Sequence, residues 1–224
     1  RHEVGVAHPD RAVGEGDAVF LGASPERLVR VEGDVVSTAA LAGTAPRGAS
    51  RAADHALGAA LCDSSKNGAE HAIVVSHLKD ALESCCDDVQ VASEPVLLRT
   101  RTVQHLCTGI RARRRAGAPV SLLDLAGRLH PTPAVGGAPR EAALRWLAEN
   151  EQANRGWFAG PVGYLQSNGD GEFAVALRSA LARGRSATAW AGAGIVARSR
   201  PAAEFTETEL KLRTVLGPLL WGAP

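Results

Sequence analysis

The sequence of 224 residues contains no methionine and only three lysines, Lys66, Lys79 and Lys211. A primary translation product begins with methionine, so we expect this chain to be a fragment or a trimmed product. Arginine supplies almost all of the positive charge. Each of the three lysines is therefore worth locating as a candidate functional group.

Long apolar runs, a strong net charge and paired cysteines are also missing. No apolar run approaches the roughly 20 residues that cross a bilayer, and no signal peptide opens the chain. The net charge is +1, and the one basic run, residues 111–115, has no interleaved aromatic residues, as is typical of a solvated helix end or loop. The four cysteines lack CxxC spacing and favour reduced thiols. We expect a cytoplasmic protein with no membrane or nucleic-acid partner.

The patterns that are present predict alternating helices and strands. Alternating apolar and polar residues predict strands, apolar residues at a 3.6-residue period predict helices, and Gly and Pro predict turns. They predict a strand at 18–22, a hairpin of 27–31 and 35–38, β-type residues over 89–108, paired strands at 171–182 and 186–199, and helices over 51–62, 69–85, 121–129, 139–154 and 201–216. No internal repeat or linker interrupts them. We expect a single α+β domain over residues 1–224, with mainly antiparallel sheets flanked by helices.

The last helix carries two carboxylates and an ammonium on one face. Glu204, Glu207 and Lys211 are spaced i, i+3 and i+7, which places them together. Glu70 is expected in the first turn of the 69–85 helix, near the positive end of its dipole. If the two helices meet, these groups would bind a hard divalent cation and an anionic ligand. Taken alone, the spacing is more typical of a solvent-facing helix in which Lys211 pairs with Glu207.

Three further features are weak when taken one at a time. Arg178, expected within an alternating strand, can offer a two-pronged donor to a carboxylate, or can simply point outward. Gly192 and Gly194 allow backbone N–H groups to approach an anion, although Gly-Ala-Gly usually marks tight packing. Glu26 follows Ser-Pro, where an isolated glutamate is more often a turn residue than a proton donor.

Nine motifs in a fixed order connect these candidates. They are residues 22–28, 41–48, 65–71, 103–106, 129–137, 155–160, 176–179, 191–196 and the Glu204/Glu207/Lys211 set. The series resembles the chorismate-utilising enzymes and covers nearly the whole chain, residues 20–216. Within that family, the segment His-Pro-Thr-Pro-Ala-Val-Gly-Gly at 130–137 is similar to the isochorismate synthase version. Anthranilate and salicylate synthases usually carry a Thr/Ser-Gly-type sequence there.

The resemblance implies conversion of chorismate to isochorismate, by addition of water at ring carbon 2 and loss of the carbon 4 hydroxyl. It implies a Mg²⁺ cofactor held by Glu70 and Glu207, with Glu204 beside it, and Glu26 as the acid that protonates the departing hydroxyl. The substrate contacts it implies are Gly43, Thr44, His105, Phe158, Arg178, Gly192, Gly194 and Lys211. Phe158 stands where many members have tyrosine, so a hydroxyl contact is lost there. Downstream enzymes of siderophore or menaquinone synthesis are the protein partners it suggests.

One part of the family pattern is missing. The lysine that activates water lies on a Lys-Val-Val-Leu-Ala-Arg-like strand upstream of Glu26, and nothing in residues 1–17 resembles that strand. Lys66 belongs to a different motif and Lys79 to the middle of a helix, so neither is assigned as the base. Three alternatives stay open: the C-terminal part of a longer isochorismate synthase, which we favour; a salicylate or aminodeoxychorismate/anthranilate synthase-type enzyme; and a non-catalytic chorismate-binding fragment.

Overall fold

The computed structural model describes residues 4–6, 18–184 and 186–220. The elements in chain order are β1(Val4–Val6), β2(Ala18–Ser24), β3(Arg27–Glu32), β4(Val35–Pro46), α1(Arg51–Cys62), α2(Ser65–Glu83), β5(Cys86–Val91), β6(Val96–Arg99), β7(Val103–Arg114), α3(Leu122–Leu129), α4(Pro133–Gly136), α5(Arg140–Asn150), β8(Pro161–Leu165), β9(Gly171–Val175), β10(Ser179–Arg183), β11(Ser186–Ala189) and α6(Pro201–Leu220). The family's lysine-bearing strand was sought in residues 1–17, and of these only residues 4–6, which form β1, are among the described residues.

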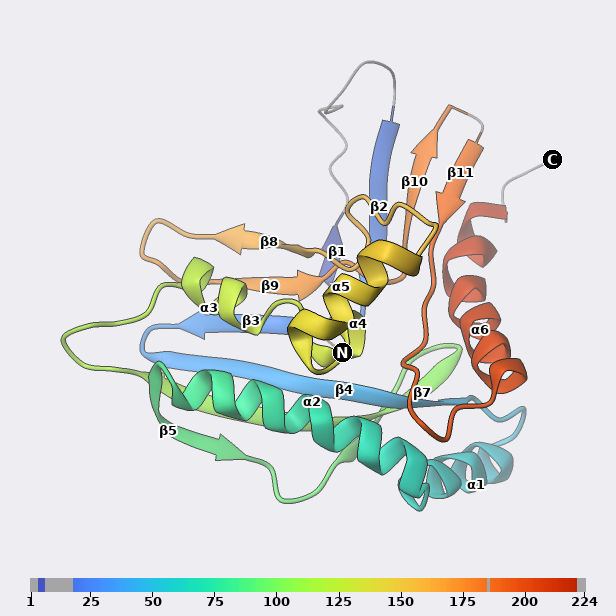
Figure 1. The fold of residues 1–224 in the computed structure, drawn as a ribbon, viewed down its shortest axis with the longest axis horizontal. Helices are drawn as coiled ribbons and strands as arrows, with labels where there is room; N and C mark the ends of the chain where they lie inside the picture. The colour runs from blue at the N-terminus through green and yellow to red at the C-terminus, as the bar shows by residue number, and fades with distance from the viewer. Residues whose placement is uncertain (1–3, 7–17, 185, 221–224) are drawn as a thin grey trace.

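The strands form two antiparallel sheets. The smaller sheet has the order β1-β2-β10-β11, and the larger has the order β5-β7-β4-β3-β9-β8, with β6 also paired to β7. Figure 1 shows β2, β10 and β11 running across the direction of β3, β8 and β9. Helix α2 lies along β4 of the larger sheet, and α1 and α6 lie near the end of that strand. The expected α+β class, with antiparallel sheets flanked by helices, is confirmed.

The longest strand pair carries a bulge that matters for the site. β3 and β4 form the predicted hairpin, with Gly33 at φ +60 in its turn. β4 then pairs with β7 along its whole length, and the register shifts between Ala42 and Thr44. The extra residue is Gly43, whose φ of +75 is readily adopted only by glycine. Past the bulge, Thr44 lies directly opposite His105.

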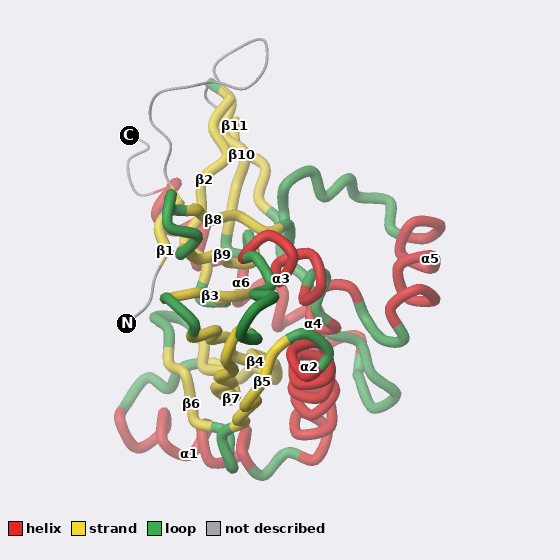
Figure 2. The backbone as a smooth tube through the Cα atoms, turned by 90° about the vertical axis from the view of Figure 1, so that its left-hand side faces the viewer, coloured by secondary structure: helices red, strands yellow, loops and turns green. Residues whose placement is uncertain are grey.

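Helix α2 packs on β4 through an apolar face. Val74, Leu78 and Leu82 are spaced one turn apart and are fully buried in the main core. The helix begins earlier than predicted, because the Ser64 hydroxyl caps it by accepting from Asn67 N–H. Glu70 consequently lies in the second turn, so its expected place in the first turn was wrong. Figure 2 shows α2 end-on beside the sheet.

Two strand predictions near the C-terminus were also wrong. The segment 171–182 is not one strand: β9 ends at Val175 in the larger sheet, and β10 begins at Ser179 in the smaller one. Arg178 lies in the break, with a left-handed φ of +51, rather than inside a strand. The strand predicted over 186–199 ends at Ala189, and a loop containing Gly192 and Gly194 follows. Both errors have one physical cause, namely that strand-type residues do not reveal which sheet, if any, will pair with them.

The basic run of residues 111–115 is also placed differently from the expected helix end or loop. Residues 111–114 form the end of β7, and Arg115 follows directly after it. Arg113 pairs with Asp34, and Arg115 pairs with Asp87. These pairs are exposed and contribute little to stability. None of the described helices combines the length and the apolar character that a membrane crossing requires.

Candidate active site

A cavity of about 450 Å³ collects side chains from segments far apart in the sequence. Its walls come from the β2–β3 link, β4, β7, α2, α4, α5, the α5–β8 link, the β9–β10 link, the loop after β11, and α6. The residues singled out from the sequence that line it are Glu26, Gly43, Thr44, Glu70, His105, Phe158, Arg178, Gly192, Gly194, Glu207 and Lys211. Glu204 does not line the cavity, but it is buried beside it and bonded to Lys66.

Glu26 lies in the short link between β2 and β3. Its backbone N–H donates to the Ser24 hydroxyl, which itself donates to the Val175 carbonyl, so the link is held against β9. Only 6% of the residue is exposed. Burial raises the pKa of Glu26 from its ordinary 4.5 to about 7, although Arg178 and Lys211 oppose the shift. A large fraction of this carboxyl group therefore carries a proton at neutral pH and can act as an acid.

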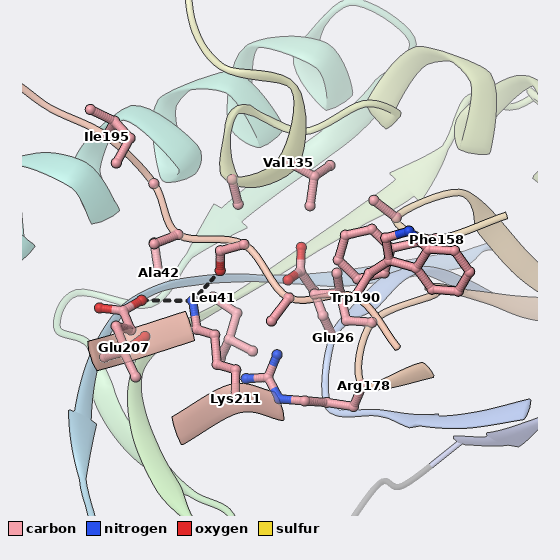
Figure 3. Close-up of a pocket in the computed structure, with 18 of the residues that line it drawn as sticks. Glu26, Leu41, Ala42, Val135, Phe158, Arg178, Trp190, Ile195, Glu207 and Lys211 are labelled. Atoms are coloured by element: carbon pink, nitrogen blue, oxygen red, sulfur yellow. Dashed lines mark hydrogen bonds and ion pairs between the residues drawn. The ribbon is translucent and has the colours of Figure 1, made fainter. Parts of the chain in front are cut away.

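An aromatic pair forms one wall near Glu26. The rings of Phe158 and Trp190 stack, with centroids 6.3 Å apart and an interplanar angle of 17°. Figure 3 shows this pair at one side of the space toward which Glu26, Arg178 and Lys211 point, with Val135 across the cavity from Arg178. An apolar wall beside Glu26 keeps water away from the carboxyl group, which is consistent with its raised pKa.

The β4 bulge and the β9–β10 link bring three polar residues together. His105 Nδ1 lies 3.1 Å from Thr44 Oγ1 and 3.3 Å from the Gly43 carbonyl oxygen, and its Nε2 lies 3.3 Å from Arg178 Nη2. Burial, with help from the positive charges of Arg178 and Lys211, lowers the pKa of His105 to about 3. The imidazole is therefore neutral at physiological pH.

Two lysines pair with the carboxylates of α2 and α6. The ammonium of Lys211 lies 2.6 Å from Glu207 and donates to the Gly192 carbonyl at 2.9 Å, so the pair expected within the last helix is confirmed. Lys66 Nζ lies 2.8 Å from Glu204 and 3.7 Å from Glu70. Lys66 thus joins α2 to α6, a role that its sequence motif does not indicate.

The pKa values in this cluster follow from burial and from neighbouring charges. Burial, reinforced by Glu207 and Glu204, raises the pKa of Glu70 despite the opposing Lys66 and Lys211. Burial alone would raise the pKa of Glu204 and lower that of Lys66. Burial is the largest single cause for each group, but the hydrogen bond between them and the other opposing interactions together outweigh it. The pKa of Glu204 is therefore lowered and that of Lys66 is raised. Both members of this pair therefore remain charged.

The donor set suits a hard divalent cation. Glu70, Glu204 and Glu207 offer carboxylate oxygens, the ligands that Mg²⁺ prefers. Among residues 4–6, 18–184 and 186–220, however, no three His, Cys, Asp or Glu side chains already converge on one point. Glu204 is instead hydrogen-bonded to Lys66, and Glu207 is ion-paired with Lys211. The chemistry of the residues therefore fits Mg²⁺, while the lysines hold the carboxylates in the arrangement described here.

Several cavity residues were not assigned a role from the sequence. They are Pro25, Leu41, Ala42, Ala134, Val135, Trp146, Leu147, Glu151, Ala153, Arg155, Ala159, Leu177, Trp190, Ala191, Ala193 and Ile195. Most of these lie inside or next to the nine motifs, so the motifs could have pointed to them. Trp146 and Leu147 lie on α5, which buries none of its residues and stands apart from the sheets in Figure 2. No motif signals their position.

The fold and the cavity define a class: antiparallel α+β domains in which a buried carboxylic acid, an arginine and a carboxylate–lysine cluster share one cavity. A family model described as "Chorismate binding enzyme" matches residues 12–220. The chain belongs to this family of chorismate-binding enzymes.

Similar proteins share the fold and much of the sequence. The chain is 43% identical over 208 residues to isochorismate synthase MenF of Bacillus subtilis, covering 93% of this chain and 44% of that protein. It is 49% identical over 198 residues to a salicylate biosynthesis isochorismate synthase of Pseudomonas aeruginosa, covering 88% and 41%. A crystal structure of a putative 2,3-dihydroxybenzoate-specific isochorismate synthase, DhbC from Bacillus anthracis, matches with a TM-score of 0.88 and 35% identity, over 96% of this chain and 56% of that one. The chain therefore spans about half the length of the relatives it matches.

Proposed function

We propose that this chain forms the acid and anion-binding part of an isochorismate synthase site, which takes chorismate as substrate and Mg²⁺ as cofactor. The observation that carries the proposal is Glu26, a buried carboxyl group with a pKa near 7 facing the same cavity as Arg178 and Lys211. Relatives named as isochorismate synthases support the choice of reaction.

The charges of the site support a need for a divalent cation. Three carboxylates, Glu70, Glu204 and Glu207, are balanced by the three cations Lys66, Lys211 and Arg178. With Glu26 protonated, the formal charge of the site is zero. Chorismate carries two carboxylates, and a neutral cavity offers them little net attraction. A bound Mg²⁺ would supply the two missing positive charges.

The chain's own residues then have distinct tasks. Glu70 and Glu207 would hold the Mg²⁺, whose chemistry is to bind and polarise a substrate carboxylate. Arg178 offers N–H donors to the other carboxylate. Glu26 gives its proton to the oxygen that leaves ring carbon 4, so that water rather than hydroxide departs. The stacked Phe158 and Trp190 limit the access of bulk water to this step.

A second candidate is chorismate binding without turnover. The incoming water must lose a proton to a base, and the whole sequence contains only three lysines. Lys66 and Lys211 are engaged by carboxylates, and Lys79 pairs with Glu83 on an exposed part of α2. This observation favours a chain that assembles the acid and the anion site and obtains a base from elsewhere.

Calorimetric titration of chorismate, with and without Mg²⁺, tests the proposal. Binding should require Mg²⁺, and Glu207→Ala should weaken it about tenfold or more, as expected for loss of a ligand oxygen worth about 1.4 kcal/mol. Glu209→Ala, an exposed carboxylate on the same helix, is the control and should bind as the wild type does. Analysis of the reaction products separates the two candidates, because only the enzyme forms isochorismate. Binding that ignores both Mg²⁺ and Glu207 would refute the proposed site.

A further inference from the structure

Arg178 contacts a histidine rather than a carboxylate. Its Nη2 lies 3.3 Å from His105 Nε2. A guanidinium group can only donate, so Nε2 must be the ring nitrogen that accepts and therefore carries no hydrogen. Within the part of the chain that the structure describes, no Asp or Glu lies within ion-pair distance of Arg178.

The other side of the ring leads to the same tautomer. His105 Nδ1 faces the Gly43 carbonyl oxygen at 3.3 Å, and a carbonyl can only accept. Nδ1 therefore carries the hydrogen. The ring is 4% exposed and its pKa is lowered to about 3, so it does not take up a second proton near neutrality. The two contacts together hold the imidazole in one tautomer and one orientation.

The same contacts determine what the Thr44 hydroxyl can do. Thr44 Oγ1 lies 3.1 Å from His105 Nδ1, which is a donor, so the oxygen can only accept there. Its own hydrogen remains available on the cavity side, where Thr44 is part of the wall. The β4 bulge at Gly43 is what brings Thr44 opposite His105.

A neutral acceptor orients an arginine without neutralising it. A carboxylate in the place of His105 would also fix the guanidinium, but the ion pair would reduce the attraction of Arg178 for a substrate anion. The imidazole takes one N–H and leaves the full positive charge and the remaining donors for the cavity.

We propose that His105 is a positioning residue that holds the Arg178 guanidinium toward the cavity as a neutral acceptor. Chorismate affinity then depends on His105 through Arg178, and not through the direct contact with the substrate that the family resemblance implied for this residue. This inference rests on the proposed function, in which Arg178 receives a chorismate carboxylate.

A double-mutant cycle measured by calorimetry with chorismate and Mg²⁺ tests the dependence. Arg178→Ala should weaken binding by about 10- to 100-fold, the range for a hydrogen bond to a charged group. His105→Ala should weaken it about tenfold alone and add nothing in the Arg178→Ala background. If the fold-losses in chorismate affinity of the two single variants instead multiply in the double variant, His105 contacts the ligand directly. That result would overturn the inference and leave the proposed function standing.

A pair of nearly isosteric variants isolates the charge. His105→Gln keeps a neutral acceptor and should bind chorismate within a few-fold of wild type, whereas His105→Glu should lose binding about 100-fold through ion pairing with Arg178. Equal affinities of the two variants would contradict the inference. Because His105→Glu can fail to fold, the unfolding midpoint of each variant is measured, and His105→Gln remains decisive without it.

A third measurement does not depend on chorismate. The ¹⁵N chemical shifts of the His105 ring in the ligand-free protein should show a protonated Nδ1 and a bare Nε2 near neutral pH. A ring protonated at Nε2 would overturn the inference whatever the ligand. If the ring has the predicted tautomer but the chain fails to bind chorismate, the result counts against the proposed function and not against the inference.

Discussion

Replacement of Glu26 by glutamine should remove a specific part of the pH dependence of folding stability. Burial raises the Glu26 pKa from 4.5 to about 7, a difference of about 2.5 units. At about 1.4 kcal/mol per unit, this corresponds to about 3 kcal/mol. Between pH 4.5 and 7 the folded chain keeps a proton that the unfolded chain releases, so this contribution to stability falls as pH rises and is lost above pH 7.

The wild-type profile alone cannot isolate this effect, because His105 acts in the opposite direction. Its pKa falls from 6.5 to about 3 on folding, so the stability it contributes is present above pH 6.5 and declines as pH falls below that value. Arg178 and Lys211, the cations that act on Glu26, are present in both chains. The difference between wild type and Glu26→Gln cancels the histidine contribution, which both chains share.

Urea unfolding at about pH 5 and about pH 8 provides the measurement. Relative to Glu26→Gln, the wild type should lose roughly 2 to 3 kcal/mol of unfolding free energy between these two pH values, because most of the titration window lies between them. The exposed Glu209→Gln serves as the control and should follow the wild type. A difference below about 0.5 kcal/mol would mean that Glu26 titrates as an ordinary carboxyl group, and the reasoning that makes it an acid at neutral pH would fail.

Two further predictions concern metal binding and the core. A Cβ on Gly194 would clash with Glu70 Oε1, the far end of a flexible side chain, whereas a Cβ on Gly192 meets nothing within 4 Å. Gly194→Ala should therefore displace that carboxylate and weaken Mg²⁺ binding about tenfold with little loss of stability. The control, Gly192→Ala, should bind Mg²⁺ as the wild type does. Equal Mg²⁺ affinities of the two variants, measured by calorimetry, would exclude Glu70 as a ligand. On α2, Leu82 is 0% exposed and Ile73 is 43% exposed. Leu82→Ala should cost about 2 to 5 kcal/mol in urea unfolding and Ile73→Ala less than about 1, and a reversal of this order would contradict the placement of the helix.

The elements with strong local signals could be predicted from the sequence. The helical period over α2 and the turn at Gly33 depend on neighbouring residues only, so the amino-acid pattern is enough to predict both. The change of sheet at residues 176–178 could not be found in this way. β9 and β10 differ in their partners, not in their residue types, and partners are chosen by the rest of the fold.

The candidate site was predictable as a set of residues but not as a set of contacts. The order of the motifs gathered Glu26, Arg178 and Lys211 at one cavity, as the structure does. The ion pair of Lys66 with Glu204 joins residues 138 positions apart, and no local pattern predicts it. The contact between His105 and Arg178 likewise depends on where two strands and a link meet in space.

The backbone conformation of Arg178 places recognition and folding in competition. A left-handed φ of +51 costs a non-glycine residue about 1 to 2 kcal/mol, and glycine at this position would avoid that cost. Selection for stability alone would thus favour losing the arginine, whereas selection for anion binding must retain it. A library screened only for thermal resistance should enrich glycine at position 178 and collect well-folded chains that no longer bind a dicarboxylate.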